Sequence, residues 1–141
     1  MRSTTYLSYE VFAEVLDHCQ AEYPLEACGI LLGTSAPPQT MVTEIIRAKN
    51  IKRSSVRYEI EPSTLQRSYF TAEMKGLEVV GIYHSHPDIP SEPSEYDAEH
   101  AFPEQIYLII SLRVKTREEV TAWRWSSQKN KFLRENLVVH R

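Results

Sequence analysis

Two histidines and one aspartate stand at a spacing that suits a metal site. His84 and His86 are separated by one residue, and Asp97 follows after a short stretch that contains prolines. Residues i and i+2 of a strand point to the same side, so an extended segment presents both imidazoles to one point. Two imidazoles and a carboxylate bind Zn²⁺ and leave its fourth tetrahedral position open for water, as in hydrolytic zinc sites. We therefore expect a catalytic zinc centre on His84, His86 and Asp97.

The segments around these residues suggest how they meet. Residues 77–84 have the composition of a strand that carries the histidines at its end. Residues 88–93 contain two prolines and predict an irregular loop. Ser94 is a typical N-cap and predicts a short helix that holds Asp97 in its first turn and ends by Pro103. A loop of fixed length followed by a capped helix can bring Asp97 back to the histidines.

Helix and strand patterns alternate along the rest of the chain. Ser8 is the expected N-cap of an amphipathic helix that ends before Pro24, and a second helix is expected over about residues 62–75. The pattern predicts an α/β domain in which the first two long strands form a hairpin. Strands are expected at residues 24–33, 41–48, 105–111, 119–125 and 131–139, with a short extended piece at 56–60.

Glu26 is the one charged residue in the otherwise apolar segment 24–33. A carboxylate at the edge of an apolar strand either lies at a solvated strand end or faces a cleft with a chemical role. Composition leaves these two interpretations open.

Other polar or aromatic side chains have a structural interpretation that we favour. His18 is expected to be solvated, and Cys28 is expected in the core rather than as a thiol in the cleft. His100, one helical turn after Asp97, is expected to be solvated rather than to support the metal ligands. Trp123 and Trp125 are expected to pack beneath a C-terminal element.

The composition is that of an ordinary globular domain. The chain has 141 residues, of which 42% are hydrophobic and 25% charged, with a formal net charge of −3. One domain over residues 1–141 is expected. The acidic balance argues against nucleic-acid binding, although Lys and Arg are denser after residue 112. With two cysteines and no run of signal-peptide or membrane-span length, we expect a cytoplasmic protein with neither membrane nor nucleic-acid partner.

The motif residues together resemble a known signature. Glu26 lies well upstream of His84-Ser85-His86-Pro87, and Ser94-Glu95-Tyr96-Asp97 begins seven residues after that proline. This order resembles the JAMM (MPN-plus) metalloprotease family, and the resemblance also covers residues 24–29 and the strand-helix order. It implies a single-domain MPN fold, similar to cytidine deaminase, with a mixed, mostly antiparallel sheet flanked by helices.

The resemblance also implies roles for the site residues. His84, His86 and Asp97 would ligate Zn²⁺, Glu26 would be the general acid and base, and Ser94 would steady the tetrahedral intermediate by a hydrogen bond.

A substrate follows from the same resemblance. Family members cleave peptide or isopeptide bonds after the Gly-Gly tail of ubiquitin-like proteins, and this short chain is similar to bacterial and archaeal members that process ThiS/MoaD-like sulfur carriers. We expect a carrier of this kind as partner, its tail adding to a sheet edge in a groove that only glycines pass. The alternatives are a phage-tail-assembly peptidase of the same family, a non-catalytic MPN scaffold and a DNA-repair-associated relative that binds nucleic acid. The oligomeric state stays open.

Overall fold

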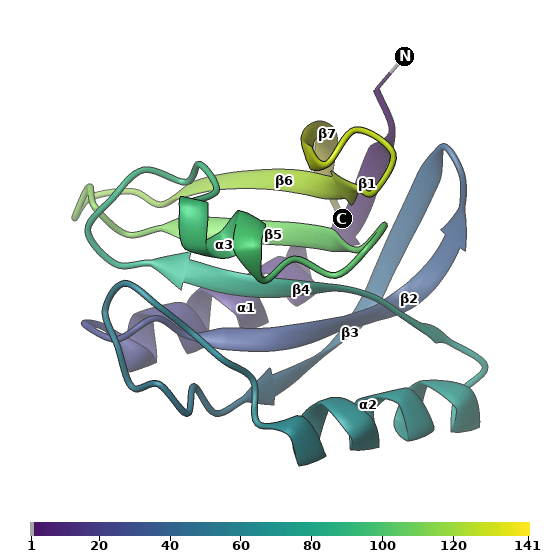
Figure 1. Cartoon of the computed structure of the whole chain (residues 1–141), viewed down its shortest axis with the longest axis horizontal. Coiled ribbons are helices and arrows are strands. Elements are labelled where there is room, and N and C mark those ends of the chain that lie inside the picture. The colour runs from purple at the N-terminus through teal and green to yellow at the C-terminus, as the bar shows by residue number, and fades with distance from the viewer. Residues whose placement is uncertain (1) are drawn as a thin grey trace.

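The computed structural model describes residues 2–141 and contains a closed barrel of seven strands with three helices (Figure 1). The strands follow the order β1-β3-β2-β4-β5-β6-β7 around the barrel, and β7 pairs with β1 to close it. The strands are β1 (Thr4–Ser8), β2 (Cys28–Ala36), β3 (Gln39–Ala48), β4 (Glu78–His86), β5 (Ile106–Ser111), β6 (Glu119–Ser126) and β7 (Lys131–His140). The helices are α1 (Tyr9–Glu22), α2 (Pro62–Met74) and α3 (Glu95–Glu99).

The sheet is mixed, and the predicted α/β class is confirmed. β1 runs parallel to β3 and to β7, and β4 runs parallel to β5. The remaining neighbouring pairs are antiparallel. Sequence analysis missed β1, and with it the closure of the barrel. This strand is short, and its place depends on pairing with β3 and β7, which come much later in the chain.

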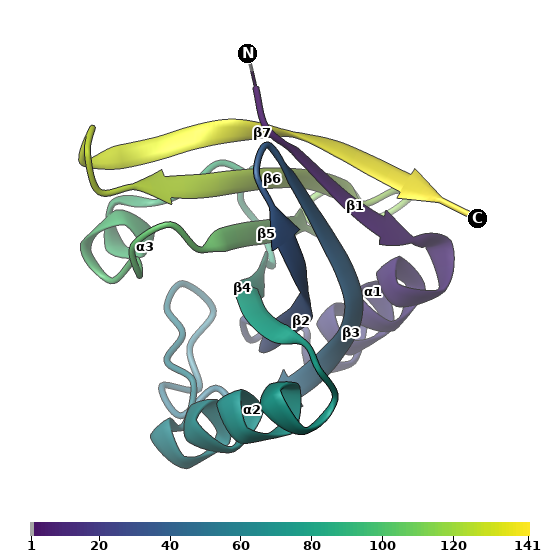
Figure 2. The same cartoon turned by 90° about the vertical axis from the view of Figure 1, so that its right-hand side faces the viewer.

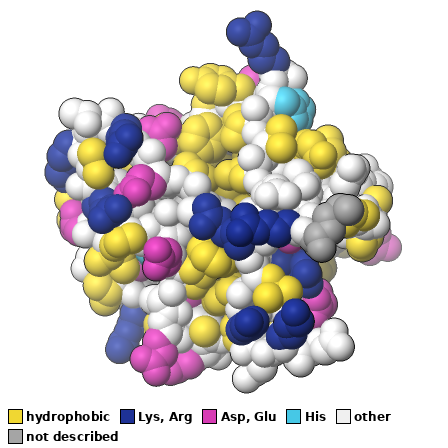
Figure 3. All heavy atoms as spheres, turned by 90° about the horizontal axis from the view of Figure 1, so that it is seen from above, with side chains coloured by type: hydrophobic (Ala, Val, Ile, Leu, Met, Phe, Trp, Pro, Cys, Tyr) yellow, Lys and Arg dark blue, Asp and Glu magenta, His cyan; other side chains and the backbone are white. Residues whose placement is uncertain are grey.

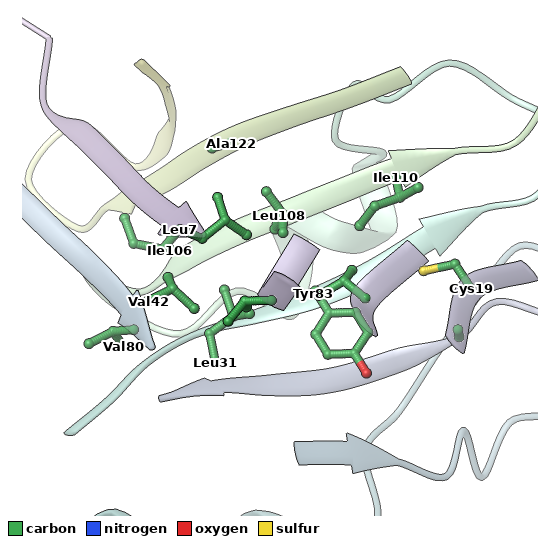
Figure 4. Packing of buried hydrophobic residues seen from close by; sticks show 13 residues of the cluster. Leu7, Cys19, Leu31, Val42, Val80, Tyr83, Ile106, Leu108, Ile110 and Ala122 are labelled. Carbon is green, nitrogen blue, oxygen red and sulfur yellow. The ribbon is translucent and has the colours of Figure 1, made fainter. Parts of the chain in front are cut away.

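α1 begins where the sequence predicts. The Ser8 side chain accepts a hydrogen bond from the main-chain N–H of Val11 at 3.1 Å and caps the helix. Val11, Val15 and Cys19 recur at helical spacing and are buried. α1 therefore covers one face of the sheet, where its residues pack with the side chains shown in Figure 4: Leu7, Leu31, Val42, Val80, Tyr83, Ile106, Leu108, Ile110 and Ala122.

His18 lies on the buried side of α1, and the expectation that it is solvated is wrong. Its ring Nδ1 is 2.7 Å from the hydroxyl of Tyr83, which projects from β4. Burial lowers the pKa of His18, the charge of Arg47 lowers it further, and the charges of Glu22 and Asp17 oppose the shift. Helical periodicity placed His18 on the flank of the helix and could not reveal a partner on a distant strand.

The opposite face of the sheet carries a second core under α2. Cys28, Ile30 and Leu32 of β2 pack there with Ile82 of β4 and Ala72 of α2. Figure 2 shows α1 and α2 on different sides of the β2–β3 hairpin. Cys28 is fully buried, so its interpretation as a core residue is confirmed, and burial raises the pKa of its thiol.

The two tryptophans of β6 pack against β7, as expected. The rings of Trp125 and Phe132 meet edge to face with centroids 5.0 Å apart. The guanidinium of Arg134 lies over the ring of Trp123 at 5.0 Å. Both tryptophans therefore help to join the last hairpin to the second core.

Three predicted strand segments differ from the structure near the site. The strand expected at 77–84 extends to His86, and the strand expected at 24–33 begins only at Cys28, so Glu26 precedes β2. The extended piece expected at 56–60 is not a strand, because only Ile60 forms an isolated bridge, with Asn50. Local alternation predicted extended backbone there, but the loop's hydrogen-bonding groups are taken by the Asn50 side chain.

Charged residues are mixed over the surface seen in Figure 3. Lys and Arg form a short row across the middle of that face and otherwise stand among acidic and apolar side chains. None of the helices in the described residues is long and apolar enough to cross a membrane.

Candidate metal centre

β4 delivers both histidines to one point. Alternation along the strand turns His84 and His86 to the side of the sheet that α2 covers, whereas Tyr83 packs in the core under α1. The Nε2 atoms of His84 and His86 lie 3.1 Å and 3.2 Å from the same oxygen, Oδ2 of Asp97. One possible ligand atom from each of the three residues falls within 4.8 Å of the others, and all three side chains are buried.

The first turn of α3 places Asp97. The Ser94 hydroxyl oxygen accepts a hydrogen bond from the Asp97 N–H at 3.0 Å, and the Ser94 N–H donates to Asp97 Oδ2 at 2.9 Å. This reciprocal pair is a capping box in which Asp97 takes the third helical position. The helix begins as predicted, and the Ser94 hydroxyl still has its own hydrogen to donate.

Asp97 is held in its charged form. Burial favours the neutral acid, but the charge of His84 and hydrogen bonds from His84, His86 and the Ser94 N–H outweigh it. The pKa of Asp97 therefore lies well below its usual range.

Glu26 lies in a dry environment beside this group. Its side chain is 2% exposed, and its Oε1 has no hydrogen-bond partner among the described residues. Burial, and secondly the negative charge of Asp97, raise the pKa of Glu26 to about 9. The solvated strand end is therefore wrong for Glu26, since its side chain is buried, and its role in the chemistry stays a prediction.

The main chain around Glu26 is held from two sides. The Glu26 N–H donates to the Ser54 carbonyl at 2.8 Å, and Asn50 Nδ2 donates to the Glu26 carbonyl at 3.0 Å. On the other side, Ala27 N–H donates to the hydroxyl of Ser85 at 2.8 Å. Ser85 separates the two histidines, so β4 positions both the imidazoles and the segment that carries Glu26.

Sequence reasoning missed several residues of this environment. Asn50 and Ser85 bind the main chain around Glu26, and Tyr58 stacks on the His84 ring with centroids 4.4 Å apart. Ser85 had a usable signal, because it lies inside the His-Ser-His motif and alternation turns it away from the histidines. Asn50 and Tyr58 had none, because they reach the site through a loop.

His100 lies outside the group, as expected. It is exposed, its Nδ1 is 2.9 Å from the Tyr96 carbonyl oxygen, and its ring stacks on that of Tyr96. It therefore closes the C-terminal end of α3 and supports none of the three residues at the centre.

A cavity of about 150 Å³ adjoins the centre. It lies between α2, α3 and the loop that carries Tyr58, and its lining is mainly apolar. The barrel closes through β1, but β1 pairs only with Gln39–Val42 of β3, so the remainder of β3 has a strand partner on one side only. The addition of a substrate tail to a sheet edge stays a prediction. The cavity is lined by Tyr58, Glu59, Ile60, Leu65, Ile82, Tyr96, His100 and Phe102.

The residues at the centre fit a divalent cation. Nδ1 of His86 lies 2.7 Å from the Pro90 carbonyl oxygen, which can only accept, so Nδ1 carries a proton. The other nitrogen, Nε2, faces Asp97 Oδ2, and a metal bound there would take its lone pair in place of a proton, an arrangement common among metal-binding histidines. A cation at this point would also offset the negative charge that raises the pKa of Glu26.

Comparisons with known proteins assign the chain to a family. The family described as prokaryotic homologs of the JAB domain matches residues 8–126. A desampylase of Pyrococcus furiosus is 34% identical over 82% of this chain and 76% of its own length. A probable TtuB-protein conjugate cleaving protease of Thermus thermophilus is 30% identical over 68% of this chain and 62% of its own.

Two further proteins extend the likeness. The Lys-63-specific deubiquitinase BRCC36 of Camponotus floridanus is 26% identical over 79% of this chain and 50% of its own length. The solution structure of a protein from Desulfitobacterium hafniense superimposes with a TM-score of 0.86 at 26% identity, covering 96% of this chain and 92% of that one. The family match covers most of the described fold and includes every residue of the candidate centre. The chain therefore belongs to the prokaryotic homologs of the JAB domain, within the JAMM/MPN family.

Proposed function

We propose that this chain is a zinc-dependent peptidase that cleaves the bond after the C-terminal Gly-Gly of a ubiquitin-like protein of the ThiS/MoaD sulfur-carrier type. Its relatives include a desampylase, a conjugate-cleaving protease and a deubiquitinase, which support a peptidase or isopeptidase acting on ubiquitin-like conjugates. The observation that carries the proposal is the meeting of two imidazole Nε2 atoms at one Asp97 oxygen, beside the buried carboxyl of Glu26. The cytoplasmic location stays a prediction.

His84, His86 and Asp97 would hold the metal in this proposal. Zn²⁺ bound there would polarise a carbonyl and lower the pKa of a coordinated water to about 7. Asp97 stays charged at any working pH, because its pKa is held low. The proton on His86 Nδ1, held by the Pro90 carbonyl, keeps Nε2 turned toward the other two ligands.

Glu26 moves the proton in this mechanism. Without a cation its pKa near 9 keeps it protonated at neutral pH, and a nearby positive charge lowers that value toward the range of a general base. Glu26 accepts a proton from water and then donates one to the departing amine. Its burial excludes bulk solvent, which would otherwise exchange this proton. Ser94 donates its hydroxyl hydrogen to the developing oxyanion while its oxygen remains the helix cap.

The cavity next to the centre supports a narrow substrate. Tyr58 stacks on His84, so the wall of the cavity that Tyr58 forms reaches a candidate ligand, and Tyr96 lines the same cavity. A space of about 150 Å³ suits a glycine-rich tail better than one with large side chains. Tyr58 and Tyr96 are themselves joined, because the Tyr96 hydroxyl donates to the Tyr58 carbonyl at 3.1 Å.

The test is cleavage of a ThiS-type carrier that bears several residues after its Gly-Gly. The purified chain loaded with Zn²⁺ should release a product ending in Gly-Gly, a chelator should stop cleavage, and added Zn²⁺ should restore it. Glu26→Gln should lower kcat by at least about a thousandfold with its zinc content unchanged. Asp97→Asn should lose both zinc and activity.

The control is a matched carrier that has Ala-Ala in place of the two glycines. This control substrate should not be cleaved. Equal turnover by wild type and Glu26→Gln, or cleavage at another bond, would contradict the proposal.

A further inference from the structure

We infer that Ser111 and Thr121 are positioning residues for His86, acting through the proline loop, residues 87–93. This inference rests on the proposed function, in which His86 binds the metal. The two hydroxyls hold the loop in the conformation that offers the Pro90 carbonyl to the His86 ring. Neither residue belongs to the signature that identifies the family.

Three consecutive carbonyls of the proline loop each accept a hydrogen bond from a strand side chain. The Ser111 hydroxyl donates to Ile89 O at 2.5 Å. His86 Nδ1 donates to Pro90 O at 2.7 Å. The Thr121 hydroxyl donates to Ser91 O. The Pro90 carbonyl, which orients His86, therefore lies between two carbonyls that are each held by a hydroxyl group.

These donors come from three neighbouring strands. His86 of β4 pairs in register with Ser111 of β5, and β5 pairs with β6, which carries Thr121. Ser111 is fully buried, and Thr121 is 9% exposed. The Leu112 N–H donates to the His86 carbonyl at 3.1 Å, which continues the β4–β5 contact to the start of the loop. The loop is thus attached to the part of the barrel that carries the metal ligands.

The directions of the two hydroxyl bonds are set by further contacts. The Trp123 Nε1–H donates to Thr121 Oγ1 at 2.7 Å, so the hydroxyl hydrogen of Thr121 is directed to Ser91 O. The Arg113 N–H donates to Ser111 Oγ at 3.3 Å in the same manner. Each hydroxyl therefore accepts one hydrogen bond from a group two residues further along its own chain segment and donates one hydrogen bond to a carbonyl of the loop.

The loop cannot hold itself by regular main-chain bonding. Pro87, Pro90 and Pro93 have no N–H group, so within the loop there are few donors for its carbonyls. Without the two hydroxyls, the Pro90 carbonyl would be free to turn away from His86. The His86 ring could then rotate and turn Nε2, the nitrogen that would bind the metal, away from Asp97.

The experiment compares Thr121→Val and Ser111→Ala with wild type. Valine keeps the shape of threonine and removes only the donor. Zinc affinity is measured by competition with a chromogenic chelator, and the solvent exchange of the His86 Nδ1–H, which donates to Pro90 O, by ¹⁵N NMR of the metal-free protein. Each variant should bind Zn²⁺ about 10- to 100-fold more weakly. The His86 Nδ1–H should exchange with solvent at least about tenfold faster than in wild type.

Two further variants separate positioning from folding. Thr121→Ser restores the hydroxyl and should recover affinity to within about threefold of wild type. Thr43→Val removes a comparable hydroxyl from β3, away from the proline loop. There the Thr43 hydroxyl donates to the Leu32 carbonyl at 3.4 Å, and its loss should leave zinc affinity unchanged. If Thr121→Val does not fold, Ser111→Ala and its NMR spectrum decide the question alone.

The outcomes distinguish this inference from the proposed function. Wild-type affinity and unchanged exchange of the His86 Nδ1–H in both variants would overturn the positioning role while leaving the metal site intact. Failure of wild type to bind Zn²⁺ would overturn the proposed function, and the exchange of the His86 Nδ1–H in metal-free protein would still test whether the hydroxyls orient its ring.

Discussion

Asn50 Nδ2 donates to the main-chain oxygen of Glu26 at 3.0 Å, and this bond joins the candidate acid-base residue to the loop over residues 51–59. The same amide nitrogen donates to Arg57 O at 3.0 Å, and its Oδ1 accepts from the N–H groups of Lys52 and Glu59. Both hydrogens and both lone pairs of the side-chain amide are therefore used. Asn50 holds Glu26 and the loop that places Tyr58 against His84 in one arrangement.

Replacing Asn50 by Asp should disturb this arrangement strongly. The variant keeps the shape of the side chain but removes both donors, which leaves two carbonyls without a partner. We expect the free energy of unfolding to fall by about 2–4 kcal/mol and kcat to fall by at least about tenfold. Urea unfolding and cleavage kinetics measure the two effects.

A variant in the same loop provides the control for Asn50. Lys52→Ala removes only an exposed ion pair with Glu59, 3.6 Å long, and should change stability by less than about 1 kcal/mol. If Asn50→Asp behaved like Lys52→Ala, the Asn50 contacts would have no role in holding Glu26.

Glu26→Gln should stabilise the metal-free protein while abolishing cleavage. The folded-state pKa of Glu26 is raised to about 9 from an ordinary value of 4.5, so folding is opposed at any pH where the unfolded chain ionises this group. This cost grows as pH rises from about 4.5 to about 9. Glutamine removes it, and the free energy of unfolding at pH 7.5 should rise by about 2 kcal/mol.

Chelator-treated protein in urea measures this gain at two pH values. The difference between Glu26→Gln and wild type should be small at pH 4.5 and large at pH 8. The opposite trend would mean that Glu26 is stabilised as a carboxylate in the metal-free protein.

His18 should make the protein less stable in weak acid. Its pKa is lowered in the folded state, so the unfolded chain takes up a proton first as pH falls below about 6.5. The contribution of His18 is complete above pH 6.5 and is lost as pH falls through 6.5 toward the lower folded-state value. We expect a loss of about 1 kcal/mol between pH 7 and pH 5.

His18→Gln isolates this effect, because glutamine does not titrate in this range. The free energy of unfolding is measured against pH for both proteins, and the variant's values are subtracted from those of wild type. The subtraction removes the contributions of the other histidines. Parallel profiles for the two proteins would show that His18 is not responsible.

Gly29→Ala should destabilise the fold through a clash with Tyr83. A Cβ at position 29 would lie 2.2 Å from the Tyr83 ring, which is buried and bonded to His18. Displacing this ring should cost about 1–3 kcal/mol. Thr34→Ala at an exposed position of the same strand should change stability by less than about 0.5 kcal/mol, and thermal unfolding compares the two. Equal melting temperatures would contradict the predicted clash.

Local patterns in the sequence were sufficient to predict the three candidate ligands. Strand alternation turns His84 and His86 to one side, and the N-cap signal of Ser94 places Asp97 in the first turn of a helix. Both signals act over a few residues, where backbone geometry leaves little freedom. The same reasoning correctly placed α1, α2, the buried Cys28 and the packing of the tryptophans on β7.

The contacts around Glu26 could not be predicted from such local patterns. Composition left its role open, and only the resemblance of the motif gave it one. In the fold, Asn50, Ser54 and Ser85 bind the main chain at Glu26 and Ala27 from segments well separated in sequence. No local propensity encodes these contacts, because each depends on the final path of another segment.

Sequence alone therefore determined the α/β class and the family signature, and it predicted His84, His86 and Asp97 as a candidate metal group, whose side chains the structure brings together. Only the tertiary structure decided that the barrel closes through β1, that His18 is buried against Tyr83, and that Ser111 and Thr121 hold the loop beside His86. The physical reason is the range of the interactions. The hydrophobic periodicity of helices and strands and the capping of helices depend on residues close together in sequence. Barrel closure and buried polar contacts form only when strands distant in sequence meet and exclude water.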